Sequence, residues 1–90
     1  MSSPEHRAEA LDVYVFAAPH PRAALSAVED ALDRSAGELA ALRLKPVGRI
    51  VEATLTLRGL SIAAAEALAD RLSLQAGVHA LKLEHLRGRA

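Results

Sequence analysis

The chain has no cysteine and no tryptophan, and Tyr14 and Phe16 are its only aromatic residues. Without cysteine, disulfide bonds, thiolate metal sites and cysteine nucleophiles are all excluded. Domains that bind RNA on a sheet stack its bases on exposed aromatic rings, and two aromatic residues are a weak platform for this. The core must therefore be built mainly from leucine, valine, isoleucine and alanine.

The chain also has no excess of either charge and no long apolar run. Eleven basic side chains balance eleven acidic ones, whereas nucleic-acid-binding domains usually carry a basic excess or stripe. No apolar run approaches the roughly 20 residues of a membrane-spanning helix, and the polar segment 1–9 lacks the apolar stretch of a signal peptide. We expect no nucleic acid, no membrane and a cytoplasmic location, with residues 1–9 as a flexible tail before one domain, 10–87.

Hydrophobic periodicity divides the rest of the chain into six elements. Period-two alternation predicts strands, and helical spacing predicts two helices, in the order strand 11–17, helix 21–35, strands 38–45 and 49–59, helix 62–74 and strand 78–86. Pro46 and Gly48 indicate the turn between the middle strands. The order βαββαβ predicts an α+β, ferredoxin-like fold, with an antiparallel sheet ordered 4-1-3-2 and both helices on one face.

A weak internal sequence repeat, with a spacing of forty residues, supports this order. Moving residues 23–40 by forty positions onto 63–80 gives eight identities, of which five are alanine; the informative ones pair Asp30 with Asp70, Leu32 with Leu72 and Gly37 with Gly77. The same shift places Val13 and Val15 on the strand face of Ala53 and Leu55. The expected core is Val13, Val15, Leu25, Val28, Leu32, Val51, Leu55, Leu57, Leu68, Leu72, Leu81 and Leu83.

This face assignment leaves Tyr14 and Phe16 on the open side of the sheet, together with Thr54 and Thr56. That open side is one candidate docking surface, and the exposed helix faces are the other. The second strand is expected at a sheet edge, where unpaired backbone groups invite a second copy of the chain. The sequence thus favours a homodimer formed through strand 38–45.

No group of reactive side chains indicates catalysis. His79 and His85 are expected as surface or edge residues, and His6 falls in the tail. The acidic side chains of the two helices are expected to be solvated, and the chain has neither a phosphate-binding loop nor a nucleophile elbow. We therefore expect no enzyme activity, no metal and no cofactor.

The stretch FAAPHPRAAL, residues 16–25, predicts a rigid strand-to-helix corner. Pro19 ends the strand, and Pro21 suits the first helical position, where an N–H is not needed. The free N–H groups and positive dipole end of a helix suit a carboxylate, to which Arg22 can add a charge-assisted contact. The candidate ligand-binding residues are His20, Pro21, Arg22, Ala23 and Ala24. The alternative is a structural turn with a solvated arginine.

Residues 11–86 resemble an ACT domain, a small amino-acid-binding regulatory module, and within that family the short regulatory subunits of acetohydroxyacid synthase. The segment HPRAALSAV, 20–28, resembles the family's Asp-x-Pro-Gly-x-Leu-x-x-Val loop, and LSLQAGVHALKL, 72–83, resembles its closing strand. Leu25 and Val28 match that pattern, whereas Pro21 is one position early. Ala23 replaces the glycine that lets the backbone approach the ligand.

The resemblance implies a non-catalytic regulatory subunit that binds a branched-chain amino acid and a catalytic large subunit. A stand-alone dimeric binding module with another small ligand is an alternative. A small enzyme on the same fold, such as an acylphosphatase-like one, is a third reading, for which the sequence offers no convincing arginine–asparagine pair. A structural copy that has lost its ligand also stays open because of Ala23.

Overall fold

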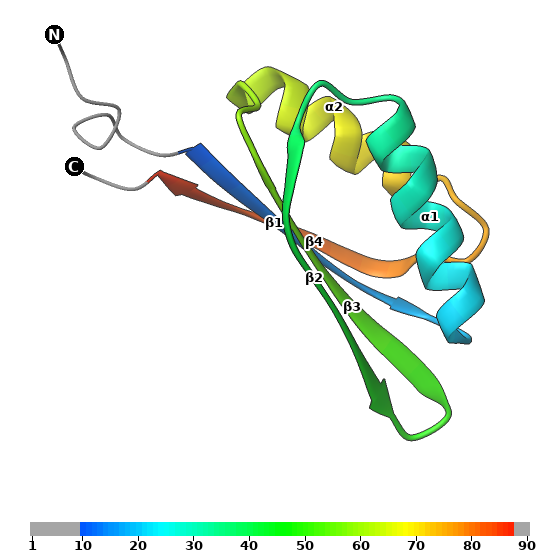
Figure 1. Ribbon diagram of the computed structural model, residues 1–90. Helices are drawn as coiled ribbons and strands as arrows, with labels where there is room; N and C mark the ends of the chain where they lie inside the picture. Colours follow the sequence, from blue (N-terminus) through cyan, green and yellow to red (C-terminus); the bar gives the residue numbers. More distant parts are fainter. Residues whose placement is uncertain (1–9, 88–90) are drawn as a thin grey trace, which may run out of the picture.

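Two helices cover one face of a four-stranded antiparallel sheet, and the opposite face is open (Figure 1). This computed structural model describes residues 10–87, so the expected tail 1–9 lies outside the described residues. The elements are β1 (Ala10–Ala18), α1 (Pro21–Asp33), β2 (Glu38–Val47), β3 (Ile50–Arg58), α2 (Ile62–Ser73) and β4 (His79–Arg87). The sheet order β2-β3-β1-β4 confirms the predicted ferredoxin-like fold.

A tight hairpin joins β2 to β3. Val47 pairs with Ile50 across a two-residue turn, in which Gly48 has a φ of 62°, a conformation that glycine adopts at little cost. Pro46 was predicted in the turn, but it lies within β2 opposite Val51. β2 is an edge strand, where a residue without an N–H is tolerated.

The core lies between the sheet and the helices. Of the expected core residues, Val28, Val51, Leu55, Leu57, Leu68 and Leu72 are buried. Leu32, Leu81 and Leu83 are partly buried against the same cluster. Alanines from both helices complete the core, and they let the helices approach the sheet closely because a methyl group takes little space.

The predicted face of β1 was wrong. Tyr14 and Phe16 are buried under the helices, whereas Val13 and Val15 pair with Thr56 and Thr54 on the open side. Burying two aromatic rings removes more apolar surface from water than burying two valines. The Tyr14 hydroxyl also donates a hydrogen bond of 2.9 Å to the Ala65 carbonyl, so its polar end is satisfied. The two aromatic residues therefore do not form a docking surface.

The two βαβ halves repeat with a spacing of 41 residues rather than forty. The helix caps His20 and Ser61 are 41 positions apart, as are the helix starts Pro21 and Ile62. Buried residues follow the same spacing, with Ala24 matching Ala65, Ala31 matching Leu72, and Tyr14 matching Leu55. A shift of one residue turns a strand's side chains to the other face, which explains the error in β1.

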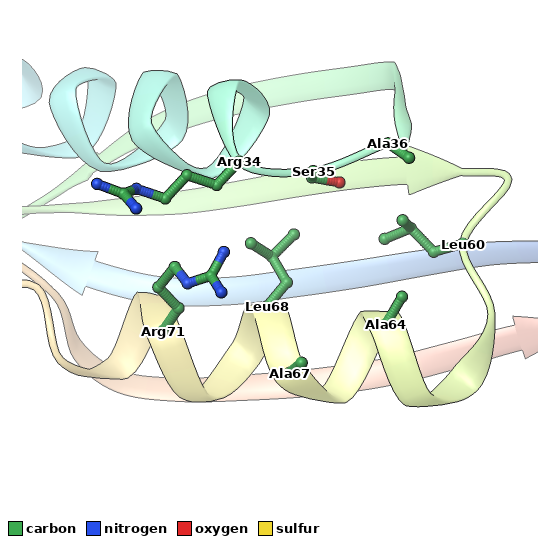
Figure 2. A pocket seen from close by; sticks show the side chains of 8 residues that line it. All are labelled: Arg34, Ser35, Ala36, Leu60, Ala64, Ala67, Leu68 and Arg71. Atoms are coloured by element: carbon green, nitrogen blue, oxygen red, sulfur yellow. The ribbon is translucent and has the colours of Figure 1, made fainter.

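Each half also contacts the start of the other half's helix through a glycine. A Cβ on Gly37 would lie 2.9 Å from Leu60 Cγ, and one on Gly77 would lie 3.0 Å from the Ala23 Cβ. Leu60 and Leu68 point into the space between the end of α1 and α2 (Figure 2). The segment that follows each helix therefore lies close to the start of the other helix, at Gly37 against Leu60 and at Gly77 against Ala23.

Candidate functional site

The corner between β1 and α1 is capped by its own histidine. The His20 backbone is extended, and its ring Nδ1 accepts a hydrogen bond of 3.2 Å from the Ala23 N–H. The Ala24 N–H donates to the His20 carbonyl at 3.3 Å. These two bonds satisfy donors that a bound anion would otherwise use.

Arg22 carries the donors that remain at this corner. Pro21 has no N–H, and the Arg22 N–H has no hydrogen-bond acceptor among residues 10–87. The Arg22 side chain is exposed and has no acidic partner within 4.0 Å in the same range. A carboxylate could therefore bind the backbone and guanidinium of Arg22 without displacing the histidine cap.

A shallow hollow of about 510 Å³ lies beside this corner, lined by His20, Pro21, Arg22 and Leu25. The structure thus brings three of the five predicted site residues to one surface. Ala23 is half-buried, and Ala24 is fully buried, so its methyl group faces the core instead of the hollow.

Leu25 was predicted in the core, but it is 43% exposed at the wall of the hollow. At a spacing of 41 residues its counterpart in α2 is Glu66, which is also exposed. Both are therefore surface positions of their helices. The correct repeat spacing was the signal that could have identified Leu25 as a surface residue.

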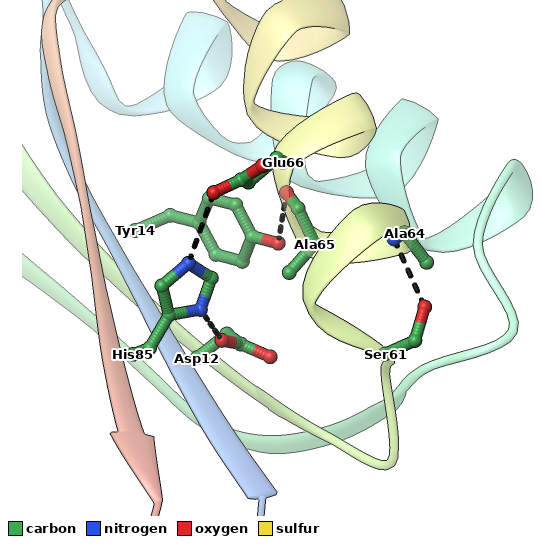
Figure 3. A network of polar contacts seen from close by, with 7 residues as sticks. All are labelled: Asp12, Tyr14, Ser61, Ala64, Ala65, Glu66 and His85. Atoms are coloured by element: carbon green, nitrogen blue, oxygen red, sulfur yellow. Dashed lines mark hydrogen bonds and ion pairs between the residues drawn. The ribbon is translucent and has the colours of Figure 1, made fainter.

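A second polar feature, the Asp12 network, lies under α2 (Figure 3). Asp12 on β1 is fully buried, and its Oδ1 lies 2.5 Å from Nδ1 of His85 on the neighbouring strand β4. The other ring nitrogen, Nε2, lies 3.6 Å from Glu66 Oε2. Both ring nitrogens of His85 thus face carboxylates, which ties β1, β4 and α2 together rather than offering a base to a ligand.

This network was not predicted from the sequence. His85 was expected as a surface histidine and Glu66 as a solvated carboxylate, with no relation between them. The available signal was Asp12, which alternates with Tyr14 and Phe16 and so shares their buried face. A buried carboxylate needs a partner, and a histidine on another strand is the natural one in a chain with few buried polar residues.

Two further observations concern residues 10–87. They contain no group of three or more histidine or acidic side chains placed to hold a metal ion. Neither of their helices is long and apolar enough to cross a bilayer.

Comparisons with known proteins find likeness at the level of structure. No family model and no curated protein matches the sequence. The C-terminal domain of the MgtC protein from Mycobacterium tuberculosis superposes with a TM-score of 0.68 and 24% identity, covering 96% of this chain and 95% of that one. The ACT domain from GTP pyrophosphokinase of Chlorobium tepidum superposes with a TM-score of 0.66 and 14% identity, covering 87% of this chain and 99% of that one. At these identities the likeness establishes the fold, and the chain has the ferredoxin-like fold of ACT domains.

Proposed function

We propose that the protein is a regulatory module that binds a small amino acid at the α1 corner. The observation that carries this proposal is the composition of the hollow: a cation, Arg22, lies beside the apolar surfaces of Pro21 and Leu25. A carboxylate on Arg22 and an aliphatic side chain against Leu25 would use both. The ACT fold supports the proposal, because the resembling family uses this fold to bind amino acids.

The ligand proposed is a branched-chain amino acid. Leu25 is about half exposed, and covering the rest of it with an aliphatic group is worth about 1 kcal/mol. Charge-assisted hydrogen bonds to a carboxylate contribute about 1.5–3 kcal/mol. Together these terms favour weak, reversible binding, which suits a metabolite sensor.

The larger role proposed is that of the small regulatory subunit of acetohydroxyacid synthase, in a complex with the catalytic large subunit. The support is the sequence resemblance over residues 11–86 together with the ACT fold. An effector regulates such a complex only if it binds one state more tightly than another. A coupling free energy of about 1–3 kcal/mol is enough for useful feedback.

We further propose a homodimer through the edge strand β2. Leu39 and Val47 on this strand are 49% and 46% exposed, and no other strand of residues 10–87 pairs with its outer side. A second copy would extend the sheet to eight strands. Sedimentation equilibrium should give twice the chain mass, and Leu39→Lys should shift the protein to monomer. The matched control is Leu74→Lys, because Leu74 is 85% exposed beyond the end of α2. A wild-type protein that sediments as a monomer would contradict the proposed dimer.

The ligand proposal is tested by calorimetry with valine, leucine and isoleucine. Arg22→Gln should weaken binding about tenfold, since it removes a charge-assisted contact. Leu25→Ser should weaken the binding of leucine more than the binding of alanine. Arg49→Gln in the β2–β3 turn should leave binding unchanged. His20→Ala should strengthen binding, because it frees the Ala23 N–H for the carboxylate. No heat with any of the three amino acids would reduce the corner to a structural turn.

The regulatory role is tested separately by mixing the protein with an acetohydroxyacid synthase large subunit from the same cells. Co-purification, and acetolactate formation that changes on addition of the protein, would support it. If the amino acid binds, but the large subunit neither co-purifies with the protein nor changes its rate of acetolactate formation, the protein is instead a stand-alone binding module.

A further inference from the structure

We propose a second ligand site, the interhelix groove, which binds a small organic carboxylate with a short apolar body. The groove lies between the end of α1 and the side of α2 that faces it, at the opposite end of α1 from the His20 corner (Figures 1 and 2). Its volume is about 170 Å³. The inference is independent of the proposed function, because it uses none of the residues of the α1 corner.

Two arginines line this groove. Arg34 follows the last residue of α1, and Arg71 lies in the last turn of α2. Their side chains lie at the same end of the groove on opposite walls, with the guanidinium of Arg71 turned toward Leu68 and that of Arg34 turned away from it (Figure 2). A favourable helix dipole explains one arginine at each helix end. It does not require the two side chains to line one cavity.

The charge balance in the groove favours an anion. Arg34 Nε lies 3.0 Å from Asp30 Oδ1, and Gln75 Nε2 donates to Asp30 Oδ2 at 2.7 Å, so this carboxylate is already occupied on both oxygens. No acidic side chain of residues 10–87 lies within 4.0 Å of a nitrogen of Arg71. Asp30 therefore pairs with the guanidinium of Arg34 alone, and a bound carboxylate would supply a partner to Arg71.

The rest of the groove is apolar. Leu60 and Leu68 are 5% and 3% exposed and form its inner surface, and the methyl groups of Ala64 and Ala67 form the α2 side. A carboxylate with a short branched chain matches both the arginine end and the leucine surface.

The test is a titration of the full-length ¹⁵N-labelled protein with sodium 4-methylpentanoate, followed by amide chemical shifts. The expected result is a saturable shift of the amides of Ser35, Ala36, Ala64 and Ala67, with a dissociation constant in the millimolar range for so small a ligand. The matched uncharged probe, 4-methylpentan-1-ol, should give no saturable shift at these amides because it cannot pair with the guanidinium groups.

Three variants make the assignment specific. Arg71→Gln should raise the dissociation constant about tenfold, as the loss of one charge-assisted contact predicts. Arg43→Gln, an exposed arginine on β2, should leave it unchanged, and so should Arg22→Gln, which separates the groove from the α1 corner. Shifts that do not saturate, that the alcohol reproduces, or that Arg71→Gln leaves unchanged would overturn the proposal.

Discussion

The two halves of the chain place different chemistry at equivalent positions. Beneath α2, His85 on β4 pairs with buried Asp12 on β1, and Glu66 on α2 lies above them. At a spacing of 41 residues, the counterparts of His85, Asp12 and Glu66 are Leu44 on β2, Ala53 on β3 and Leu25 on α1. Leu44 and Ala53 are paired partners in the sheet, as His85 and Asp12 are. A polar network therefore lies beneath α2, whereas α1 has an apolar residue exposed at the equivalent position.

This difference explains why the candidate ligand corner lies on α1. The network gives α2 polar contacts to the strands beneath it, because Glu66 faces the His85 ring and Ala65 accepts from Tyr14. On α1, the residue equivalent to Glu66 is Leu25, which stands exposed beside a hollow. The same scaffold position contacts a polar network in one half, and in the other it lines the hollow that we propose as a ligand site.

The largest effect is expected from breaking the polar network beneath α2. His85→Leu copies the residue of the other half, but it leaves the buried Asp12 carboxylate without its ring partner, and we expect a loss of about 3–5 kcal/mol in the free energy of unfolding. Urea unfolding measures this loss.

The double variant Asp12→Ala with His85→Leu makes the two halves alike and is the control. Because both polar partners are replaced together, we expect it to recover most of the loss. A double variant no more stable than His85→Leu would show that the network contributes more than the pairing of these two residues.

A smaller effect distinguishes the two repeat spacings. The forty-residue repeat equates Leu72 with Leu32, whereas a spacing of 41 equates it with Ala31, and Leu72 and Ala31 are each 1% exposed. Leu72→Ala should cost about 2–5 kcal/mol because it opens a cavity in the core. Leu32→Ala should cost only about 1 kcal/mol, since that side chain is half-buried. Equal losses in thermal or urea unfolding would contradict the 41-residue spacing.

Much of the fold could be predicted because its signals are local. The clean alternation of β3 identified Val51, Leu55 and Leu57 as core residues, and the stripe on α2 identified Leu68 and Leu72. β1 is different because it is apolar on both faces, so alternation alone does not say which face is inward. The decision depends on Asp12, whose buried position becomes tolerable only when His85, far along the chain, is brought beside it.

The site was less predictable for a similar reason. Pro21 and Arg22 could be placed from the turn pattern, and His20 was included as a corner residue. Its role as the helix cap depends on the ring orientation, which the sequence does not specify. The exposure of Leu25 depends on the rotation of α1 about its axis, and a stripe of small residues dominated by alanine sets that rotation weakly.

The smallest effect concerns the caps that begin the two helices. Ser61 Oγ accepts from the Ala64 N–H at 3.0 Å, and His20 Nδ1 accepts from the Ala23 N–H at 3.2 Å. Ser61→Ala should cost about 1 kcal/mol, a usual value for removing a serine cap. Histidine is not among the preferred caps, so His20→Ala should cost less, and His20→Ser should stabilise the protein by a few tenths of a kcal/mol. Thermal unfolding of the three variants tests this order. If His20→Ser lowers the stability, the imidazole contributes packing at the corner beyond its cap, and the ligand experiments with His20 variants would then report that packing as well as the freed N–H.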